Sequence, residues 1–323
     1  MDNNLNMTGT YIFYKDGKEI SRNKNIITKF GKRFLTQYLA GVGAGQSKDI
    51  AIGIGTSEAS VNNTQLDFEF YRIRAAIESS DIQTDAATGV SSYAVVYKAT
   101  LPVDVAGYIY EVGIFPSISF GSSDYQSQII STFENPLFWL DEVSLPAQSE
   151  TDPVPPIGTN WMSVTSENGA IKEYSYTTDI DLTGYSANDS LTLAYRQTDL
   201  NLDYVFIRMY SSDTDYYEVR FQGDSIKNRL SKINLRYPYN NIDVDDTTGY
   251  NVGSPTKDIK KISVGVKANT GLDSVVLFDG LRINDEDSFR TDYGMISRSV
   301  LTNPQIKELG KEMDIEYRLG INF

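Results

Sequence analysis

Histidine and cysteine are both absent from this chain of 323 residues. Without histidine, the chain cannot build a Ser-His-Asp or Cys-His catalytic arrangement or an imidazole general base. Without cysteine there are no disulfides, and with both residue types missing no ordinary zinc site can form. These absences exclude the most common hydrolase and zinc-enzyme chemistry, and they leave the redox compartment undetermined.

Long apolar runs and positive charge are also scarce. No apolar run approaches the ~18 residues of a membrane-spanning helix, and the polar, acidic start at 1–6 is unlike a signal peptide. The chain has 43 acidic against 29 basic residues, a formal net charge of −14. Phosphate backbones and anionic lipid repel such a chain, so neither nucleic-acid binding nor membrane insertion is expected.

The residues that are abundant favour β structure. Hydrophobic residues make up 40% of the chain and aromatic residues 12%, with 22 Tyr and 14 Phe. Tyr, Thr, Val and Ile suit pleated, half-buried surfaces. Apolar residues at helical spacing predict one helix over 25–39, and the Asp16-Gly17 pair predicts a hairpin. The expected fold class is mainly β.

Four motifs in the first half occur in a recognisable order. They are Ile-Ala-Ile-Gly-Ile-Gly-Thr at 50–56, Asn-Thr-Gln-Leu at 63–66, an Arg-bearing strand at 68–74, and Tyr-Glu-Val-Gly-Ile-Phe at 110–115. This part of the chain resembles the small β-rich domain of many tailed-bacteriophage tail, baseplate, fibre-base and collar proteins. The resemblance implies a virion protein that contacts other virion proteins. It also implies a homo-oligomer, either a trimer or a ring, because virion positions are symmetric.

The composition changes sharply after residue 140. Four of the ten prolines lie in 141–156, which predicts a stiff, solvated linker. Short alternating runs separated by polar turns fill 157–287 and predict an antiparallel β-sandwich. The final strand-like run, 313–321, returns to the style of the first half. We therefore expect a discontinuous β-rich mounting domain, 1–140 and 288–323, with the sandwich inserted into it.

The run 275–283 resembles the last strand of jelly-roll carbohydrate-binding modules. That resemblance implies a structural calcium ion with Asp279 as a candidate ligand; the sequence requires no other cofactor. Sugar recognition uses exposed aromatic faces beside polar groups. The candidates are Trp161, Tyr216, Tyr217, Tyr237 and Tyr239. For each of them, core packing or an incidental surface position is the simpler interpretation.

The predicted function is a non-enzymatic structural component of a tailed phage particle. We expect it to be associated with the tail, baseplate or fibre and to display the jelly roll for binding host glycan. Two alternatives stay open: a capsid or collar decoration protein without a ligand, and a glycan-degrading depolymerase. A depolymerase needs two carboxylates about 5 to 10 Å apart across a sugar cleft. Acid pairs such as Asp213 and Asp215 are plentiful, but turn-rich acids are mostly solvated. A bacterial surface adhesin is a third hypothesis.

Overall fold

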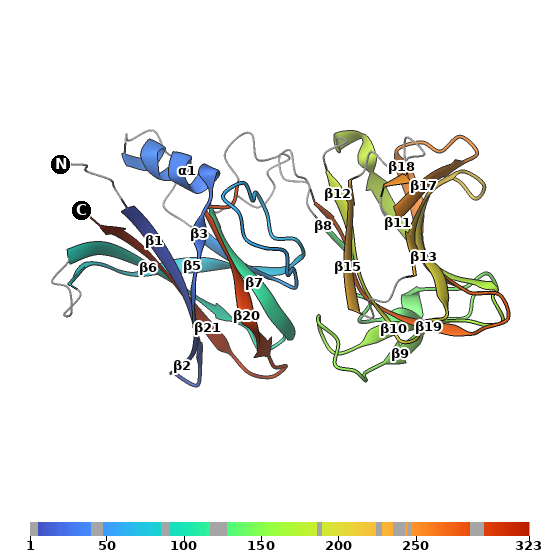
Figure 1. The fold of residues 1–323 in the computed structure, drawn as a ribbon, viewed down its shortest axis with the longest axis horizontal. Coiled ribbons are helices and arrows are strands. Elements are labelled where there is room, and N and C mark those ends of the chain that lie inside the picture. Colours follow the sequence, from blue (N-terminus) through green and yellow to red (C-terminus); the bar gives the residue numbers. More distant parts are fainter. Residues whose placement is uncertain are drawn as a thin grey trace. The chain divides into compact units, whose positions relative to one another are not determined.

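A computed structural model of the chain describes residues 6–39, 48–84, 91–116, 128–185, 189–223, 228–234, 243–244, 247–284 and 294–322. The chain forms two compact units: unit 1 comprises Met1–Tyr125 and Ser288–Phe323, and unit 2 comprises Gln126–Asp287. Antiparallel sheets make up most of both units (Figure 1). The expected fold class, mainly β with an antiparallel sandwich, is confirmed. None of the described helices is long and apolar enough to cross a membrane.

The described part of unit 1 forms a nine-stranded sheet in the order β2-β1-β21-β6-β5-β4-β7-β20-β3. A single α-helix accompanies the described strands of this unit. The elements are β1 (Asn6–Lys15), β2 (Lys18–Lys24), β3 (Ile26–Ile27), α1 (Lys29–Leu39), β4 (Lys48–Gly53), β5 (Glu69–Thr84), β6 (Ser91–Leu101), β7 (Gly107–Pro116), β20 (Ser297–Lys307) and β21 (Met313–Asn322).

The first hairpin and the helix follow from local sequence signals. Asp16 and Gly17 both have positive φ, 52° and 72°, as a two-residue type I′ turn between β1 and β2 requires. The helix begins at Lys29 rather than at residue 25, because β3 pairs with β20 instead. The hydroxyl of Thr28 accepts a 2.9 Å hydrogen bond from the Gly31 N–H and caps the helix.

Two strands that follow unit 2 in the sequence complete the sheet of unit 1. β20 lies between β7 and β3, and β21 lies between β1 and β6. Ile114 of β7 and Ser297 of β20 are register partners. The host strands on either side of the second unit in the sequence are therefore neighbours in one sheet, which is the geometry that a domain insertion needs.

A buried ion pair holds the connection between β4 and β5. Arg298 of β20 donates to Glu111 of β7 through Nη2 at 2.8 Å, and also to Asp67 at 2.8 Å. Glu111 additionally accepts backbone N–H groups from Gly55 and Phe68, each at 2.9 Å. The Tyr-Glu-Val-Gly-Ile-Phe motif thus supplies the carboxylate that satisfies these buried donors, as a buried charge requires.

Unit 2 is a sandwich of two antiparallel sheets of six described strands each. The β19 sheet has the order β15-β12-β19-β10-β9, with β8 also paired to β19, and the β13 sheet has the order β11-β18-β13-β14-β17-β16. The β19 sheet contains β8 (Gln128–Ser131), β9 (Gln148–Glu150), β10 (Trp161–Ser166), β12 (Ser190–Gln197), β15 (Asn228–Asn234) and β19 (Ser274–Asn284). The β13 sheet contains β11 (Ile171–Asp181), β13 (Leu202–Tyr210), β14 (Tyr216–Gln222), β16 (Asp243–Val244), β17 (Thr247–Val252) and β18 (Asp258–Ala268). Two short 3-10 helices are η1 (Pro136–Phe138) and η2 (Leu182–Gly184).

One hydrophobic core, formed by inward-facing side chains of both sheets, fills this sandwich. It includes residues from the segment that the sequence predicted to be a linker. Within 141–156, β9 pairs with β10 and Ala147 is buried in the core. The linker expectation is therefore corrected: this segment belongs to unit 2, because its backbone completes a sheet despite its prolines.

Candidate functional site

The outer face of the β13 sheet is the candidate site. Alternate residues of a strand point to opposite faces of the sheet, and the inward-facing residues of β13 lie in the core: Val205, Ile207 and Met209. The residues between and beside them lie on the other face: Tyr204, Phe206, Arg208 and Tyr210. This outer face therefore combines aromatic rings with a guanidinium group.

Neighbouring strands extend this chemistry across the sheet. On β14, Tyr216, Glu218 and Arg220 lie opposite Tyr210, Arg208 and Phe206, respectively. On β18, the register partners of β13 are Lys261, Ser263, Gly265 and Lys267. Glu173 of β11 is the register partner of Gly265, and Tyr250 of β17 is the register partner of Glu218. Five strands thus contribute side chains to one continuous face.

Arg208 is the electrostatic centre of the face. Its Nε donates to Glu218 at 2.5 Å and its Nη1 to Glu173. Glu173 also accepts hydrogen bonds from the hydroxyls of Tyr210, at 2.7 Å, and Ser263. Burial alone would lower the pKa of the Arg208 guanidinium, but the Glu173 and Glu218 carboxylates outweigh it and raise that pKa. Arg208 therefore carries its charge at every ordinary pH.

The aromatic rings are held in place by the cations. Arg208 Cζ lies 4.4 Å from the ring centroid of Phe206 and 5.1 Å from that of Tyr216. Arg220 Cζ lies 4.5 Å from the centroids of both Tyr204 and Tyr250. Such stacking of cations on ring faces fixes both partners.

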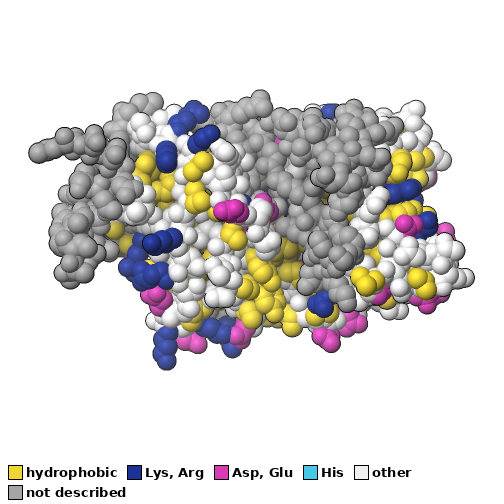
Figure 2. Space-filling view, viewed as in Figure 1, with side chains coloured by type: hydrophobic (Ala, Val, Ile, Leu, Met, Phe, Trp, Pro, Cys, Tyr) yellow, Lys and Arg dark blue, Asp and Glu magenta, His cyan; other side chains and the backbone are white. Residues whose placement is uncertain are grey.

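Two of these rings remain accessible. Tyr216 is partly exposed and Tyr250 is 37% exposed, whereas Phe206 is fully buried. Tyr216 lies opposite Val252, two residues from Tyr250, so the two tyrosines are diagonal neighbours on the sheet. Figure 2 shows basic, acidic and hydrophobic side chains intermixed on the part of unit 2 that carries β17 and β18.

The structure separates the aromatic residues that the sequence singled out. Tyr216 lies on the outer face. Tyr217 points into the core and its hydroxyl donates to the carbonyl of Pro255 at 3.0 Å. Trp161 is 4% exposed and its indole donates to the carbonyl of Pro153. Trp161 and Tyr217 are therefore corrected to structural residues, and Tyr237 and Tyr239 lie outside the described residues.

Sequence reasoning missed most of the face. The additional residues are Glu173, Tyr204, Phe206, Arg208, Tyr210, Glu218, Arg220 and Tyr250. A signal was present in 204–210, where aliphatic side chains alternate with aromatic rings and an arginine. The face of this strand that is turned away from the core is thus also aromatic, and Tyr204, Phe206 and Tyr210 are buried there, as in a strand that is covered on both faces.

Asp279 is the candidate calcium ligand. Its side chain is fully buried in β19; Oδ2 accepts the Ile157 N–H at 2.7 Å, and Oδ1 has no hydrogen-bond partner. Burial raises the pKa of this carboxyl well above its usual range, the Ile157 N–H lowers it only in part, and the negative charge of Glu134 raises it further. Two carboxylates that repel each other, one with an orphaned buried oxygen, fit a divalent cation.

The backbone at 158–160 lies close against the carboxylate of Glu134. Its carboxylate accepts the backbone N–H groups of Thr159, at 2.9 Å, and Asn160, at 3.1 Å. Gly158 has φ +66°, and a Cβ there would lie 2.0 Å from Glu134 Oε1. In the part of the chain that is described, no three acidic side chains are grouped to hold a metal ion. Calcium here would therefore depend on backbone carbonyls and water as its other ligands.

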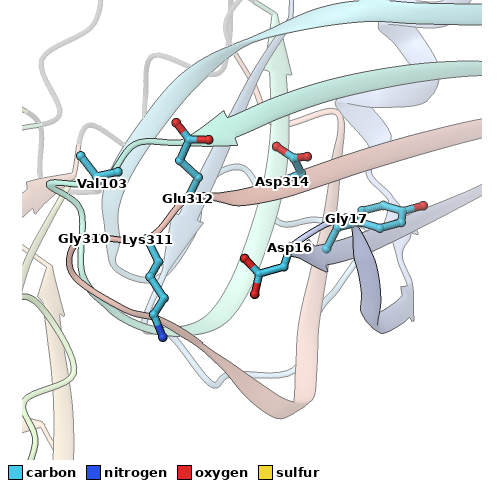
Figure 3. A pocket seen from close by; sticks show the side chains of 8 residues that line it. Asp16, Gly17, Val103, Gly310, Lys311, Glu312 and Asp314 are labelled. Atoms are coloured by element: carbon cyan, nitrogen blue, oxygen red, sulfur yellow. The ribbon is translucent and has the colours of Figure 1, made fainter.

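An open pocket of about 370 Å³ lies in unit 1, between the β1–β2 turn and the β20–β21 connection (Figure 3). Acidic side chains, Asp16, Glu312 and Asp314, and Lys311 line it. Asp314 already accepts the Thr100 hydroxyl at 2.6 Å, and Lys311 pairs with Glu308. This pocket offers acids and one ring, that of Tyr14, so we assign it no ligand.

One of the acid pairs considered for a depolymerase, Asp213 and Asp215, lies in a turn. Asp213 is fully exposed. Asp215 accepts the hydroxyl of Ser212 at 2.6 Å and the backbone N–H of Ser254 at 2.8 Å, so it stabilises the turn. These two residues have the contacts of turn acids and not of a catalytic pair.

The chain matches no protein-family model and no curated protein sequence. Among solved structures it is similar to an exo-β-agarase, with 13% identity over 50% of this chain and 26% of that one, at a TM-score of 0.37. It therefore spans about a quarter of the agarase chain. It is also similar to the family 11 carbohydrate-binding module from Clostridium thermocellum, solved with a β-1,3-1,4-mixed-linked tetrasaccharide, with 15% identity over 49% of this chain and 95% of the module, at a TM-score of 0.35. A cellulose-specific module, CBM28, is 13% identical over 48% of this chain and 92% of its own, at a TM-score of 0.26. All three TM-scores lie below 0.5, so the function is inferred below from the residues of this chain.

Proposed function

We propose that unit 2 binds a carbohydrate chain on the outer face of the β13 sheet. The observation that carries this proposal is the pair of accessible rings, Tyr216 and Tyr250, beside Arg208, Glu218 and Arg220. A sugar presents apolar C–H faces and a rim of hydroxyl groups. It is therefore matched by flat aromatic rings surrounded by charged hydrogen-bonding groups.

We propose that this face does not catalyse glycan cleavage. A glycosidase needs one carboxylic acid that can donate a proton to the leaving group. Glu218 is buried and both of its oxygens accept from arginine, and Glu173 accepts from Arg208, Tyr210 and Ser263. Neither carboxylate has an oxygen left to act on a glycosidic bond, and this supports binding without hydrolysis.

Binding to a panel of soluble polysaccharides by affinity electrophoresis tests the proposal. We expect at least one polysaccharide to retard the full chain. Tyr216→Ala and Tyr250→Ala should each lower the affinity about tenfold, because each removes one ring that stacks on a sugar. Tyr108→Ala, on β7 of unit 1, is the matched control and should bind like the wild type. No retardation by any polysaccharide, or tyrosine variants that bind like the wild type, would rule out this face. Release of reducing ends would contradict the non-catalytic assignment.

We also propose that a structural calcium ion is held in unit 2 by Asp279 and Glu134. The orphaned Oδ1 of Asp279 supports it, because an unpartnered buried carboxylate oxygen is otherwise costly. The ion would neutralise both carboxylates and tie β19 to Glu134.

For unit 1 we propose a mounting role on a tailed-phage particle, associated with the tail, baseplate or fibre. The motifs at 50–56 and 110–115, in their order along the chain, support this role. Gold labelling of purified particles with an antibody against unit 2 tests it. Label at the tail end would support an adhesion role, label over the shell would indicate decoration, and no label on any particle would exclude the virion proposal.

A further inference from the structure

Glu218 holds two guanidinium groups of the outer face in a defined orientation. Its Oε2 accepts from Nε of Arg208 and its Oε1 from Nε of Arg220. Arg208 also donates to Glu173 through Nη1. Tyr210 also lies in hydrogen-bonding contact with the Arg208 guanidinium. Among the described residues, neither Nη atom of Arg220 donates to a protein group. Each arginine is thus fixed at its Nε, and Arg220 keeps free donors at its far end.

The rings beneath these arginines restrict them further. Arg220 is stacked on Tyr204 and Tyr250, and Arg208 on Phe206 and Tyr216. A guanidinium that is stacked and held at one side loses little rotamer entropy on binding. Its Nη groups then form a planar fork that matches the oxygens of a carboxylate or a sulfate.

Four basic side chains of the described residues gather on this face, two beside buried acids and two beside exposed acids. It carries Arg208, Arg220, Lys261 and Lys267 against Glu173 and Glu218. The acids that meet the two lysines are exposed: Asp213 lies 3.8 Å from Lys261, and Asp203 lies 2.9 Å from Lys267. Exposed pairs of this kind contribute little and are easily rearranged. A chain with a net charge of −14 thus places four cations where its accessible rings lie, two of them paired only with exposed acids.

We infer that the ligand of the outer face is an acidic polysaccharide, whose repeating sugars carry carboxylate or sulfate groups. The Nη groups of Arg220 hold the charged substituent, while Tyr216 and Tyr250 stack on the sugar rings. This inference rests on the proposed carbohydrate binding and adds the class of sugar.

Matched pairs of polymers test the inference on the full chain. Polygalacturonate is compared with the same polymer fully methyl-esterified, which keeps the backbone and removes the charge; dextran sulfate is compared with dextran. We expect titration calorimetry to show at least about tenfold tighter binding to the charged member of one pair. The affinity should also fall as the NaCl concentration rises, because salt screens the contact. Preference in the first pair identifies carboxylate as the recognised group, and preference in the second identifies sulfate.

Substitutions on the face test which side chains bind the charged group. Arg220→Gln should reduce binding of the charged polymer to the level of its uncharged partner, with an unchanged circular dichroism spectrum. Lys261→Gln, a milder change, should cost two- to threefold. Arg22→Gln, which removes a comparable arginine paired with Glu19 on β2 of unit 1, should change nothing.

The outcomes separate the two proposals. Equal binding of charged and uncharged polymers, or binding that is insensitive to salt and to Arg220→Gln, would overturn the acidic assignment and leave carbohydrate binding in place. Binding to none of these four polymers while another, neutral glycan is bound would also overturn it. Binding to no glycan at all would overturn both.

Discussion

Asp279 lies in the middle of β19 with its side chain fully buried, and one of its two oxygens has no partner. An ionised carboxylate in such a position costs several kcal/mol unless a cation or a proton neutralises it. A proton and a calcium ion would both remove this charge, but they differ in what they link. The proton leaves the oxygen unlinked to the rest of the protein, whereas the ion would connect β19 to Glu134.

Calcium should therefore raise the unfolding temperature of unit 2, because a ligand that binds only the native state stabilises it by about 2.7 kcal/mol at a concentration of 100 times its Kd. Tryptophan fluorescence reports this unit, since both tryptophans, Trp139 and Trp161, are buried in it. Asp279→Asn should abolish the calcium response, whereas Asp213→Asn, at a fully exposed acid, should retain it. An identical melting curve in calcium and in a chelator would show that no ion binds here.

At the scale of elements, the aromatic face of the β13 sheet depends on Gly265 of β18, which leaves room for a ring of β13. A Cβ at Gly265 would lie 2.1 Å from Cζ of Phe206. The para end of the Phe206 ring therefore lies against β18 at Gly265, and the Arg208 guanidinium lies over the ring. The arrangement of the arginines on the face depends on this close approach.

Gly265→Ala should destabilise unit 2 by about 1 to 3 kcal/mol, because the ring cannot move outward without displacing Arg208. The same change should weaken carbohydrate binding. Urea unfolding followed by tryptophan fluorescence measures the stability, and calorimetry measures the affinity. Adding Phe206→Leu to Gly265→Ala removes the ring that clashes and should recover part of the lost stability. A single Gly265→Ala variant as stable as the wild type would show that the ring is not confined.

At the scale of the whole molecule, each unit has its own source of stability. Among the described residues, the buried core of unit 2 lies within 133–283, with Ile130 packed against it. Unit 1, in contrast, depends on both ends of the chain, since β20 and β21 lie inside its sheet. The host segments on either side of unit 2 meet as sheet neighbours, so a short connection could replace it.

We therefore expect residues 126–287, expressed alone, to unfold cooperatively in urea with the tryptophan signal of the full chain. Residues 1–125 joined to 288–323 by a short Gly-Ser linker should also fold, as judged by circular dichroism. Residues 1–125 alone should not, because β1, β6, β7 and β3 would lose their partner strands. Cooperative unfolding of 1–125 alone would contradict this account, as would failure of 126–287 to fold.

Local sequence patterns determined the parts of this protein that depend on near neighbours. The Asp16-Gly17 pair predicts the β1–β2 turn, and alternation predicts the strands. The absence of histidine excludes catalysis that uses an imidazole group. The helix was placed correctly at its end, and its first four predicted residues were wrong. Ile26 and Ile27 pair with β20, a strand some 270 residues away that no local pattern could reveal.

Only the tertiary structure decided the candidate site. Alternation shows that Tyr216 and Tyr217 face opposite ways, but not which of them faces the core; that depends on the second sheet, which buries Tyr217 and leaves Tyr216 outside. Likewise Glu173, Arg208, Glu218 and Tyr250 come from four strands and meet through long-range pairing. Residue types and spacing act along the chain, whereas a binding face is assembled across it by strand order and register.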